Sequence, residues 1–290
     1  MKENLFRGVG VALVTPFDKA KNVDFNALEK LVKHVIDEGV NYVVALGTTA
    51  ETPTLSFEEK RDVFNCIVSA TNKRVPIVIG LGGNNTSELI NDFQKYDVEK
   101  ANAILSVTPY YNKPTQKGLV AHYQTLNNHT PIPIILYNVP GRTGVNMSAQ
   151  TTAEIAHTCS KVIAIKEASG QIPQCMELVN LVPKDFTVLS GDDNLAMAQI
   201  ACGFQGVISV AANCYTKKFV DMITASLANN YTLARELHYQ LLESMDLLFA
   251  EGNPAGVKYV LHRLGIIENE LRLPLIPISH SLEEKFNSLL

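Results

Sequence analysis

One lysine lies where a buried nucleophile would be expected. Lys166 comes directly after residues 162–165, a β-branched apolar run typical of a covered strand. At the end of such a strand its side chain is expected among apolar walls, which favour a neutral amine over an ammonium ion. A neutral amine can attack a ketone and form an imine, which stabilises a neighbouring carbanion. The alternative is a structural lysine paired with a carboxylate such as Glu167 or Asp192, and strand position alone leaves both open.

Four further polar residues follow other apolar runs and could act with this lysine. Tyr137 ends the fifth run, and its phenol could relay a proton during imine formation, although a single buried tyrosine is more often a packed aromatic. Arg142 follows it, and a planar guanidinium suits a substrate carboxylate, although a surface ion pair is the ordinary role of one arginine. Thr48 and Thr49, after Gly47, offer hydroxyl and N–H groups to a small carboxylate.

Eight short apolar runs alternate with amphipathic helical segments along the chain. Each run is almost continuously apolar, as is typical of parallel strands covered on both faces. The segments between them have room for one helix and two short loops, as repeated βα units require. We predict strands at residues 10–14, 42–46, 76–79, 103–107, 132–136, 162–165, 187–189 and 206–210.

Eight similar units predict an α/β fold, a closed (β/α)8 TIM barrel, with an open doubly wound sheet as the alternative. After about residue 225 the strands stop, and residues 231–250, 254–264 and 281–289 have helical patterns. We therefore expect a catalytic barrel over residues 1–225 and a helical region, 226–290, packed on it. The candidate residues all follow strands, so they fall at the rim where barrel enzymes have their active sites.

Composition and charge exclude several classes of protein. The 290 residues are 46% hydrophobic and 19% charged, as in a soluble globular protein. The net charge is −4 and there is no basic stripe, so we expect no nucleic-acid partner. No apolar run is long enough for a bilayer and no cleavage site follows the start, so we expect a cytoplasmic protein without a membrane partner. Widely spaced cysteines without a C-x-x-C pair predict free thiols at Cys66, Cys159, Cys175, Cys202 and Cys214.

Other chemistries lack the residues they need. The seven histidines fall away from the strand ends without ligand spacing, which argues against a zinc site. The glycines of residues 80–83 lack the third glycine of a dinucleotide fingerprint and the lysine of a P-loop. No Gly-x-Ser-x-Gly elbow is present. The lysine-centred chemistry is therefore favoured.

A set of ordered sequence blocks resembles the dihydrodipicolinate synthase family of pyruvate-dependent class I aldolases. The resemblance runs from Gly8 to about Leu264, and the blocks are specific in combination. They are ALVTPF at 12–17, GTTAE at 47–51, TPYYNKP at 108–114, YNVPGRTG at 137–144, KEASG at 166–170 and SGDD at 190–193, followed by Asn253-Pro254 and Lys258.

The resemblance implies a reaction and a set of roles. Lys166 would form the Schiff base with pyruvate, and Tyr137, Thr48 and Tyr111 would relay protons, Tyr111 from across a dimer interface. The implied product of condensation with L-aspartate 4-semialdehyde is 4-hydroxy-tetrahydrodipicolinate, in the first committed step of diaminopimelate and lysine biosynthesis. Members are typically homotetramers built as a dimer of dimers, and they need no metal or organic cofactor.

The resemblance also implies binding residues. Thr48 and Thr49 would hold the pyruvate carboxylate, and Arg142 the carboxylate of the semialdehyde. The backbone around Gly191 and Ile208 would line the pocket.

An allosteric lysine site is implied only in part. Asn84, Glu88 and Tyr110 match feedback-inhibited members, but Phe57 and Lys60 stand where strongly inhibited members carry histidine. A cationic Lys60 beside a cationic effector costs about 1 kcal/mol of binding energy. The sequence therefore predicts weak or absent inhibition by lysine.

Two other functions fit part of the pattern. N-acetylneuraminate lyase or a keto-deoxy-sugar-acid aldolase would share Lys166 and Tyr137 but bind a polyhydroxylated chain; Arg142 and the tyrosine pair 110–111 favour the synthase. A catalytically silent relative would bind a keto acid or regulate a partner. The intact lysine, tyrosines and Thr48 argue against a silent relative.

Overall fold

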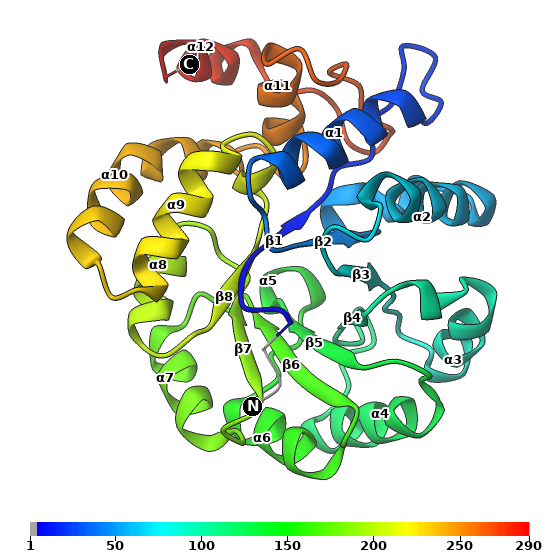
Figure 1. The fold of residues 1–290 in the computed structure, drawn as a ribbon. Helices are drawn as coiled ribbons and strands as arrows, with labels where there is room; N and C mark the ends of the chain where they lie inside the picture. Colours follow the sequence, from blue (N-terminus) through cyan, green and yellow to red (C-terminus); the bar gives the residue numbers. More distant parts are fainter. Residues whose placement is uncertain (1–4, 290) are drawn as a thin grey trace.

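The computed structural model describes residues 5–289 and contains a closed ring of eight parallel strands (Figure 1). The ring closes where β1 pairs with β8, with Gly8 beside Gly206. This pairing confirms the predicted barrel and excludes the open sheet. The strands are β1 Gly8–Ala12, β2 Tyr42–Ala45, β3 Ile77–Gly80, β4 Ala103–Val107, β5 Ile134–Asn138, β6 Val162–Glu167, β7 Thr187–Ser190 and β8 Gly206–Ser209.

Two strands that matter for the site differ from their predicted bounds. β5 begins at Ile134 and not at 132, because Pro133 has no N–H to donate to the ladder. β6 continues to Glu167 and does not stop at 165, because it has a hydrogen-bonded neighbour on each side. Lys166 therefore lies inside a strand, where its Cα is paired with Tyr137 on β5 and with Leu189 on β7.

Helices surround the ring and follow the strands in order (Figure 1). Side chains at their first residues explain where several begin: Asp24 accepts a hydrogen bond from the N–H of Ala27, and Ser56 with Glu59 forms the predicted capping box. The helices are α1 Phe25–Asp37, α2 Phe57–Thr71, α3 Thr86–Lys95, α4 Gln116–His129, α5 Pro140–Thr143, α6 Ala149–Thr158, α7 Ile172–Leu181, α8 Ala196–Ala201, α9 Thr216–Leu227, α10 Tyr231–Leu247, α11 Ala255–Arg263 and α12 His280–Leu289. Short 3-10 turns occur at η1 Thr48–Ala50, η2 Thr52–Thr54, η3 Val98–Lys100 and η4 Ala211–Asn213.

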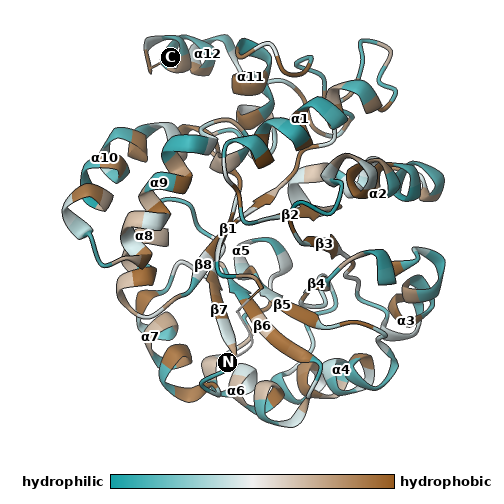
Figure 2. Ribbon diagram, in the orientation of Figure 1, coloured by the Kyte–Doolittle hydropathy of each residue, from teal (hydrophilic) through white to brown (hydrophobic). Residues whose placement is uncertain are grey.

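The strands divide the apolar core into two parts. One part fills the inside of the ring and includes Tyr42, Ile135, Ala164 and Ile208, while the larger part lies between the strands and the helices. Figure 2 shows apolar strands and helices whose outer faces are hydrophilic. Because successive side chains of a strand point to opposite faces, Lys166 shares the inside of the ring with Ala164.

The C-terminal helices lie against one side of the barrel. α10 packs on α9, α11 contacts η4, and Lys30 of α1 donates to the carbonyl of Gly265, just after α11, at 2.6 Å. We keep as a proposal the division into a barrel, 1–225, and a C-terminal region, 226–290; α9 ends near that boundary, at Leu227. Among residues 5–289, no helix combines the length and apolar character that crossing a membrane would require.

His122 on α4 makes the stability of the fold depend on pH. Its Nδ1 lies 2.8 Å from Thr86 Oγ1, and burial lowers the pKa of the imidazole from 6.5 to about 4. As the pH falls from 6.5 towards 4, the unfolded chain takes up a proton that the folded chain excludes. Stability is therefore lost over that window, by about 2 kcal/mol between pH 7 and pH 5.

The variant His122→Asn tests this dependence, because asparagine keeps a polar atom for Thr86 but does not titrate. We expect the variant to be less stable than the parent at pH 7, yet to lose about 2 kcal/mol less on transfer to pH 5. Denaturant unfolding at the two pH values measures both losses. Equal losses in the two proteins would contradict the assignment to His122.

Candidate active site

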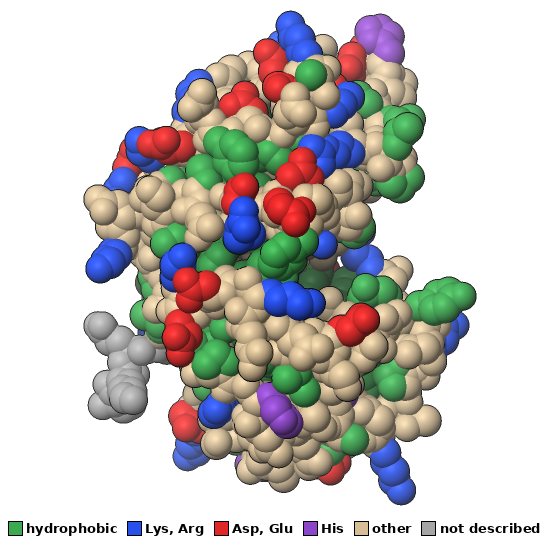
Figure 3. Space-filling view, turned by 90° about the vertical axis from the view of Figure 1, so that its right-hand side faces the viewer, with side chains coloured by type: hydrophobic (Ala, Val, Ile, Leu, Met, Phe, Trp, Pro, Cys, Tyr) green, Lys and Arg blue, Asp and Glu red, His purple; other side chains and the backbone are tan. Residues whose placement is uncertain are grey.

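A cavity of about 610 Å³ opens at the C-terminal rim of the barrel. Several candidate residues line it: Thr48 in η1 after β2, Tyr110 after β4, Tyr137 in β5 and Arg142 in α5. Figure 3 shows the molecule hollowed at its right-hand edge, and on this face basic and acidic side chains are intermixed. The strand ends thus bring together residues that are far apart in the sequence.

Lys166 lies against Tyr137, which lines the cavity, although Lys166 is not itself among the lining residues. The lysine is only 5% exposed, and its Nζ lies 4.4 Å from the centre of the Tyr137 ring. A β-carbon at Gly191 would lie 3.0 Å from Lys166 Cε and 2.5 Å from Ala168 Cβ. Glycine is therefore required at 191 for the turn after β7 to pack on the lysine stem.

Neither carboxylate considered as a structural partner forms an ion pair with Lys166 among the residues described. Glu167 points to the opposite face of β6, where it accepts hydrogen bonds from Asn138 Nδ2 at 3.0 Å and from the N–H of Ser169 at 2.7 Å. Burial raises the pKa of Asp192 to about 6, and the nearby charge of Lys166 opposes that rise. The amine is thus not locked in a fixed ion pair.

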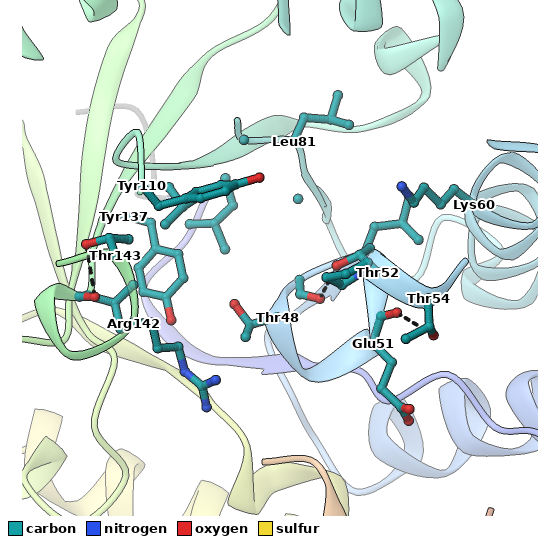
Figure 4. Close-up of a pocket in the computed structure, with 18 of the residues that line it drawn as sticks. Thr48, Glu51, Thr52, Thr54, Lys60, Leu81, Tyr110, Tyr137, Arg142 and Thr143 are labelled. Atoms are coloured by element: carbon teal, nitrogen blue, oxygen red, sulfur yellow. Dashed lines mark hydrogen bonds between the residues drawn. The ribbon is translucent and has the colours of Figure 1, made fainter. Parts of the chain in front are cut away.

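The polar groups of the cavity face one another across it. Figure 4 shows Tyr137 and Thr48 on opposite walls with their hydroxyls directed into the same space, and the Arg142 guanidinium beside the Tyr137 hydroxyl. Arg142 is presented by the single turn of α5, which begins at Pro140 and ends at Gly144 in the left-handed region (φ 72°). The sequence predicted no helix here, because four residues are too few for a periodic pattern.

Other predicted site residues lie apart from this group within one chain. Tyr111 is 88% exposed and does not line the cavity. Ile208 is buried inside the ring on β8, and Thr49 is buried beneath the turn that exposes Thr48. These positions alone assign no role to any of the three.

The residues that match the allosteric site lie near the outer part of the cavity. Asn84 Nδ2 donates to the carbonyl of Tyr110 at 3.2 Å, and Glu88 lies in the first turn of α3. Lys60 lines the cavity on the side away from Arg142 (Figure 4), while the ring of Phe57 packs 5.1 Å from that of Tyr96.

Sequence reasoning missed two polar networks that support the site. Behind β6, the amide of Gln174 joins Asn138 at the carboxylate of Glu167. Beneath η1, Glu51 forms a buried ion pair with Lys258; burial lowers the pKa of the lysine and the carboxylate counteracts this. Both networks depend on residues distant in sequence, and a single sequence carries no signal for such pairs.

The chemistry of this group is that of carbonyl activation. It offers a primary amine, a phenol next to it, a hydroxyl opposite and a guanidinium for an anionic substrate. Within residues 5–289, no cluster of three or more His, Cys, Asp or Glu side chains is arranged to hold a metal ion.

Known proteins are similar to this chain in sequence and fold over nearly their full length. A 4-hydroxy-tetrahydrodipicolinate synthase of Azobacteroides pseudotrichonymphae is 48% identical, covering 100% of this chain and 98% of the relative. The crystal structure of dihydrodipicolinate synthase from Acinetobacter baumannii, complexed with pyruvate, superposes with a TM-score of 0.94 at 40% identity over 98% of this chain and 97% of that one.

A lysine-bound structure of the enzyme from Cyanidioschyzon merolae has a TM-score of 0.95 at 34% identity, covering 99% of this chain and 98% of that one. Residues 5–290 match the Dihydrodipicolinate synthetase family. The chain therefore belongs to that family of lyases.

Proposed function

We propose that this chain condenses pyruvate with L-aspartate 4-semialdehyde to give 4-hydroxy-tetrahydrodipicolinate. One observation carries the proposal: the buried amine of Lys166 lies against the phenol of Tyr137 at the rim of the barrel, with Arg142 on the same side of the cavity. The names of the relatives support the same reaction.

The first step joins Lys166 to pyruvate. The Nζ lone pair attacks the ketone carbon, and the carbonyl oxygen takes up a proton to give a carbinolamine. Loss of that hydroxyl as water leaves the imine. We propose that Tyr137 carries the protons; the contact of its ring with the lysine and the direction of its hydroxyl into the cavity support this role (Figure 4).

The later steps form the new carbon–carbon bond and release the lysine. The imine loses a methyl proton to give an enamine, whose carbon attacks the aldehyde carbon of the semialdehyde, and the aldehyde oxygen becomes a hydroxyl. The amine of the semialdehyde then attacks the imine carbon, which closes a six-membered ring and expels the Lys166 amine. We propose that Arg142 holds the carboxylate of this second substrate during these steps, and its position in the cavity lining supports this role.

The two threonines of η1 are our candidates for the pyruvate carboxylate. Thr48 exposes its hydroxyl to the cavity opposite Tyr137, which also suits it to the proton relay (Figure 4). Thr49 is the next residue of the same turn. We further propose that Gly191, which packs on the lysine stem, and Ile208, which is buried inside the ring, line the pyruvate pocket.

A coupled assay tests the proposed reaction against the related aldolases. Turnover is expected with pyruvate plus aspartate semialdehyde, and not with sialic acid or a keto-deoxy sugar acid. Turnover with only the sugar acids would reject the proposal. Binding of pyruvate without turnover of any substrate would instead identify a silent relative.

We also propose a homotetramer built as a dimer of dimers. Tyr111 supports this arrangement, because it follows Tyr110, which lines the cavity, and is itself 88% exposed with a left-handed backbone (φ 71°). In a dimer such a side chain could complete the proton relay of the neighbouring subunit. Five free thiols and small metabolites as substrates support a cytoplasmic location.

Inhibition by lysine is expected to be weak or absent. Lys60 and Tyr110 both line the cavity, on different sides of it, and the ammonium of Lys60 would repel a cationic effector bound there. We expect half-inhibition only above about 1 mM lysine, which corresponds to less than about 4 kcal/mol of binding free energy. A steady-state titration with L-lysine measures this value, and half-inhibition far below 1 mM would contradict the prediction.

A further inference from the structure

The turn that carries Thr48 and Thr49 has a backbone that other residues must hold. It ends at Glu51, whose backbone is left-handed (φ 54°, ψ 34°). A residue with a β-carbon is disfavoured in that conformation and keeps it only where its surroundings fix it. Two contacts from the C-terminal region hold the turn in this conformation.

The first contact is the ion pair between Glu51 and Lys258 of α11. The two side chains are fully buried, with 2.5 Å between Nζ and Oε1. The other carboxylate oxygen accepts the N–H of Arg272 at 3.1 Å, and Lys258 also donates to the carbonyl of Glu270 at 2.8 Å. The Glu51 carboxylate points away from the cavity (Figure 4), so the pair acts on the turn and not on a substrate.

The second contact is a hydrogen bond to Thr49 itself. Asn253, which lines the cavity, donates from Nδ2 to Thr49 Oγ1 at 3.0 Å. A hydroxyl has a single proton, so one that accepts from an amide keeps its own proton for another partner. A carboxylate can only accept hydrogen bonds. The Asn253 amide therefore directs Thr49 to donate to an anionic ligand.

We propose that Asn253 and Lys258 are positioning residues that hold the turn 48–51 in the geometry that binds the pyruvate carboxylate. This inference rests on the proposed function, in which Thr48 and Thr49 bind that carboxylate. The competing role is to fasten the C-terminal region to the barrel. Apolar side chains of similar volume in place of Glu51 and Lys258 would fasten the C-terminal region equally well. The reason is that the desolvation of a buried ion pair offsets much of its attraction.

The double variant Glu51→Met with Lys258→Met separates the two roles, since it removes both buried charges together. We expect a folded protein in which the pyruvate concentration for half-maximal borohydride trapping of the imine rises at least tenfold. A folded double variant with an unchanged half-saturation would overturn the role of Lys258.

The variant Asn253→Asp tests the second contact and does not depend on the ion pair. Aspartate has nearly the same shape, but it would accept the Thr49 proton that the substrate needs. We expect at least a tenfold rise in the pyruvate half-saturation, and less than a twofold further rise when Asn253→Asp is added to Thr49→Val. Asn128→Asp, on the exposed end of α4, is the matched control and should change nothing. A rise that persists in the Thr49→Val background would indicate simple charge repulsion and overturn the inference.

The same trapping experiment separates failure of the inference from failure of the proposed function. If the parent protein forms no pyruvate adduct, the proposed function fails. If the parent forms the adduct and the variants saturate at the parent concentration, only the inference fails.

Discussion

Replacing Lys166 by alanine should abolish turnover and the pyruvate adduct together. The variant removes the proposed nucleophile, so the covalent route through the imine would be closed, and we expect kcat to fall by more than about 10⁴-fold. The amine also lies inside β6 against Tyr137, away from bulk solvent. Mass spectrometry after borohydride reduction with pyruvate measures the adduct, and the coupled assay measures the rate.

Two matched variants control for charge and for general damage. Lys166→Arg keeps a cation beside Tyr137, but a guanidinium is not a nucleophile at neutral pH, so it should be as inactive as the alanine variant. Lys161→Ala removes a lysine next to the start of β6, where its Nζ donates to the carbonyl of Thr130, and should leave the adduct intact. Formation of the pyruvate adduct by Lys166→Ala would show that Lys166 is not the residue that forms the Schiff base.

Removing only the hydroxyl of Tyr137 should have the second largest effect. In Tyr137→Phe the ring still contacts Lys166, but the proton relay is lost, and we expect kcat to fall by between about 10² and 10⁴-fold. The concentration of pyruvate needed for half-maximal rate should change much less, because the phenol contributes chiefly to proton transfer. Steady-state kinetics with both substrates measures the two effects separately.

Removal of a buried tyrosine hydroxyl outside the site provides the control for Tyr137→Phe. Tyr123 on α4 donates from its buried hydroxyl to the carbonyl of Ser106 at 3.0 Å, outside the cavity. Tyr123→Phe should lose about 1 kcal/mol of stability and keep its activity. If Tyr137→Phe retained more than about a tenth of the parent kcat, general acid–base catalysis at that residue would be wrong.

The barrel and the rim residues could be predicted because local patterns specify them. Continuous apolar runs gave the order of the strands, and polar residues after those runs fall at one rim in a parallel barrel. The sixth strand was predicted too short, since a charged Lys166-Glu167 pair does not look like buried strand. The hydrogen bonds of β6 to β5 and β7 outweigh the low strand preference of these two residues. The Lys166 side chain contacts Tyr137, and the Glu167 carboxylate accepts hydrogen bonds from Asn138 and Ser169.

Features that depend on distant contacts could not be predicted. Arg142 is presented by a single helical turn that no periodicity reveals. The ion pair between Glu51 and Lys258 and the bond from Asn253 to Thr49 join residues about two hundred positions apart. Only the folded arrangement of the C-terminal helices against the barrel creates these contacts.

Lys166 lies within β6, so its backbone position is fixed by the barrel, whereas the rim loops can vary in sequence and length. Its backbone is hydrogen-bonded on both sides in a ring without edges, so changes in the rim loops leave the backbone of Lys166, the proposed nucleophile, where it is. Arg142, in contrast, is carried by one short turn between strands. If Arg142 and Lys166 have the roles proposed above, divergence or design could exchange the acceptor aldehyde by rebuilding that turn, while the residue proposed to activate the keto acid keeps its position.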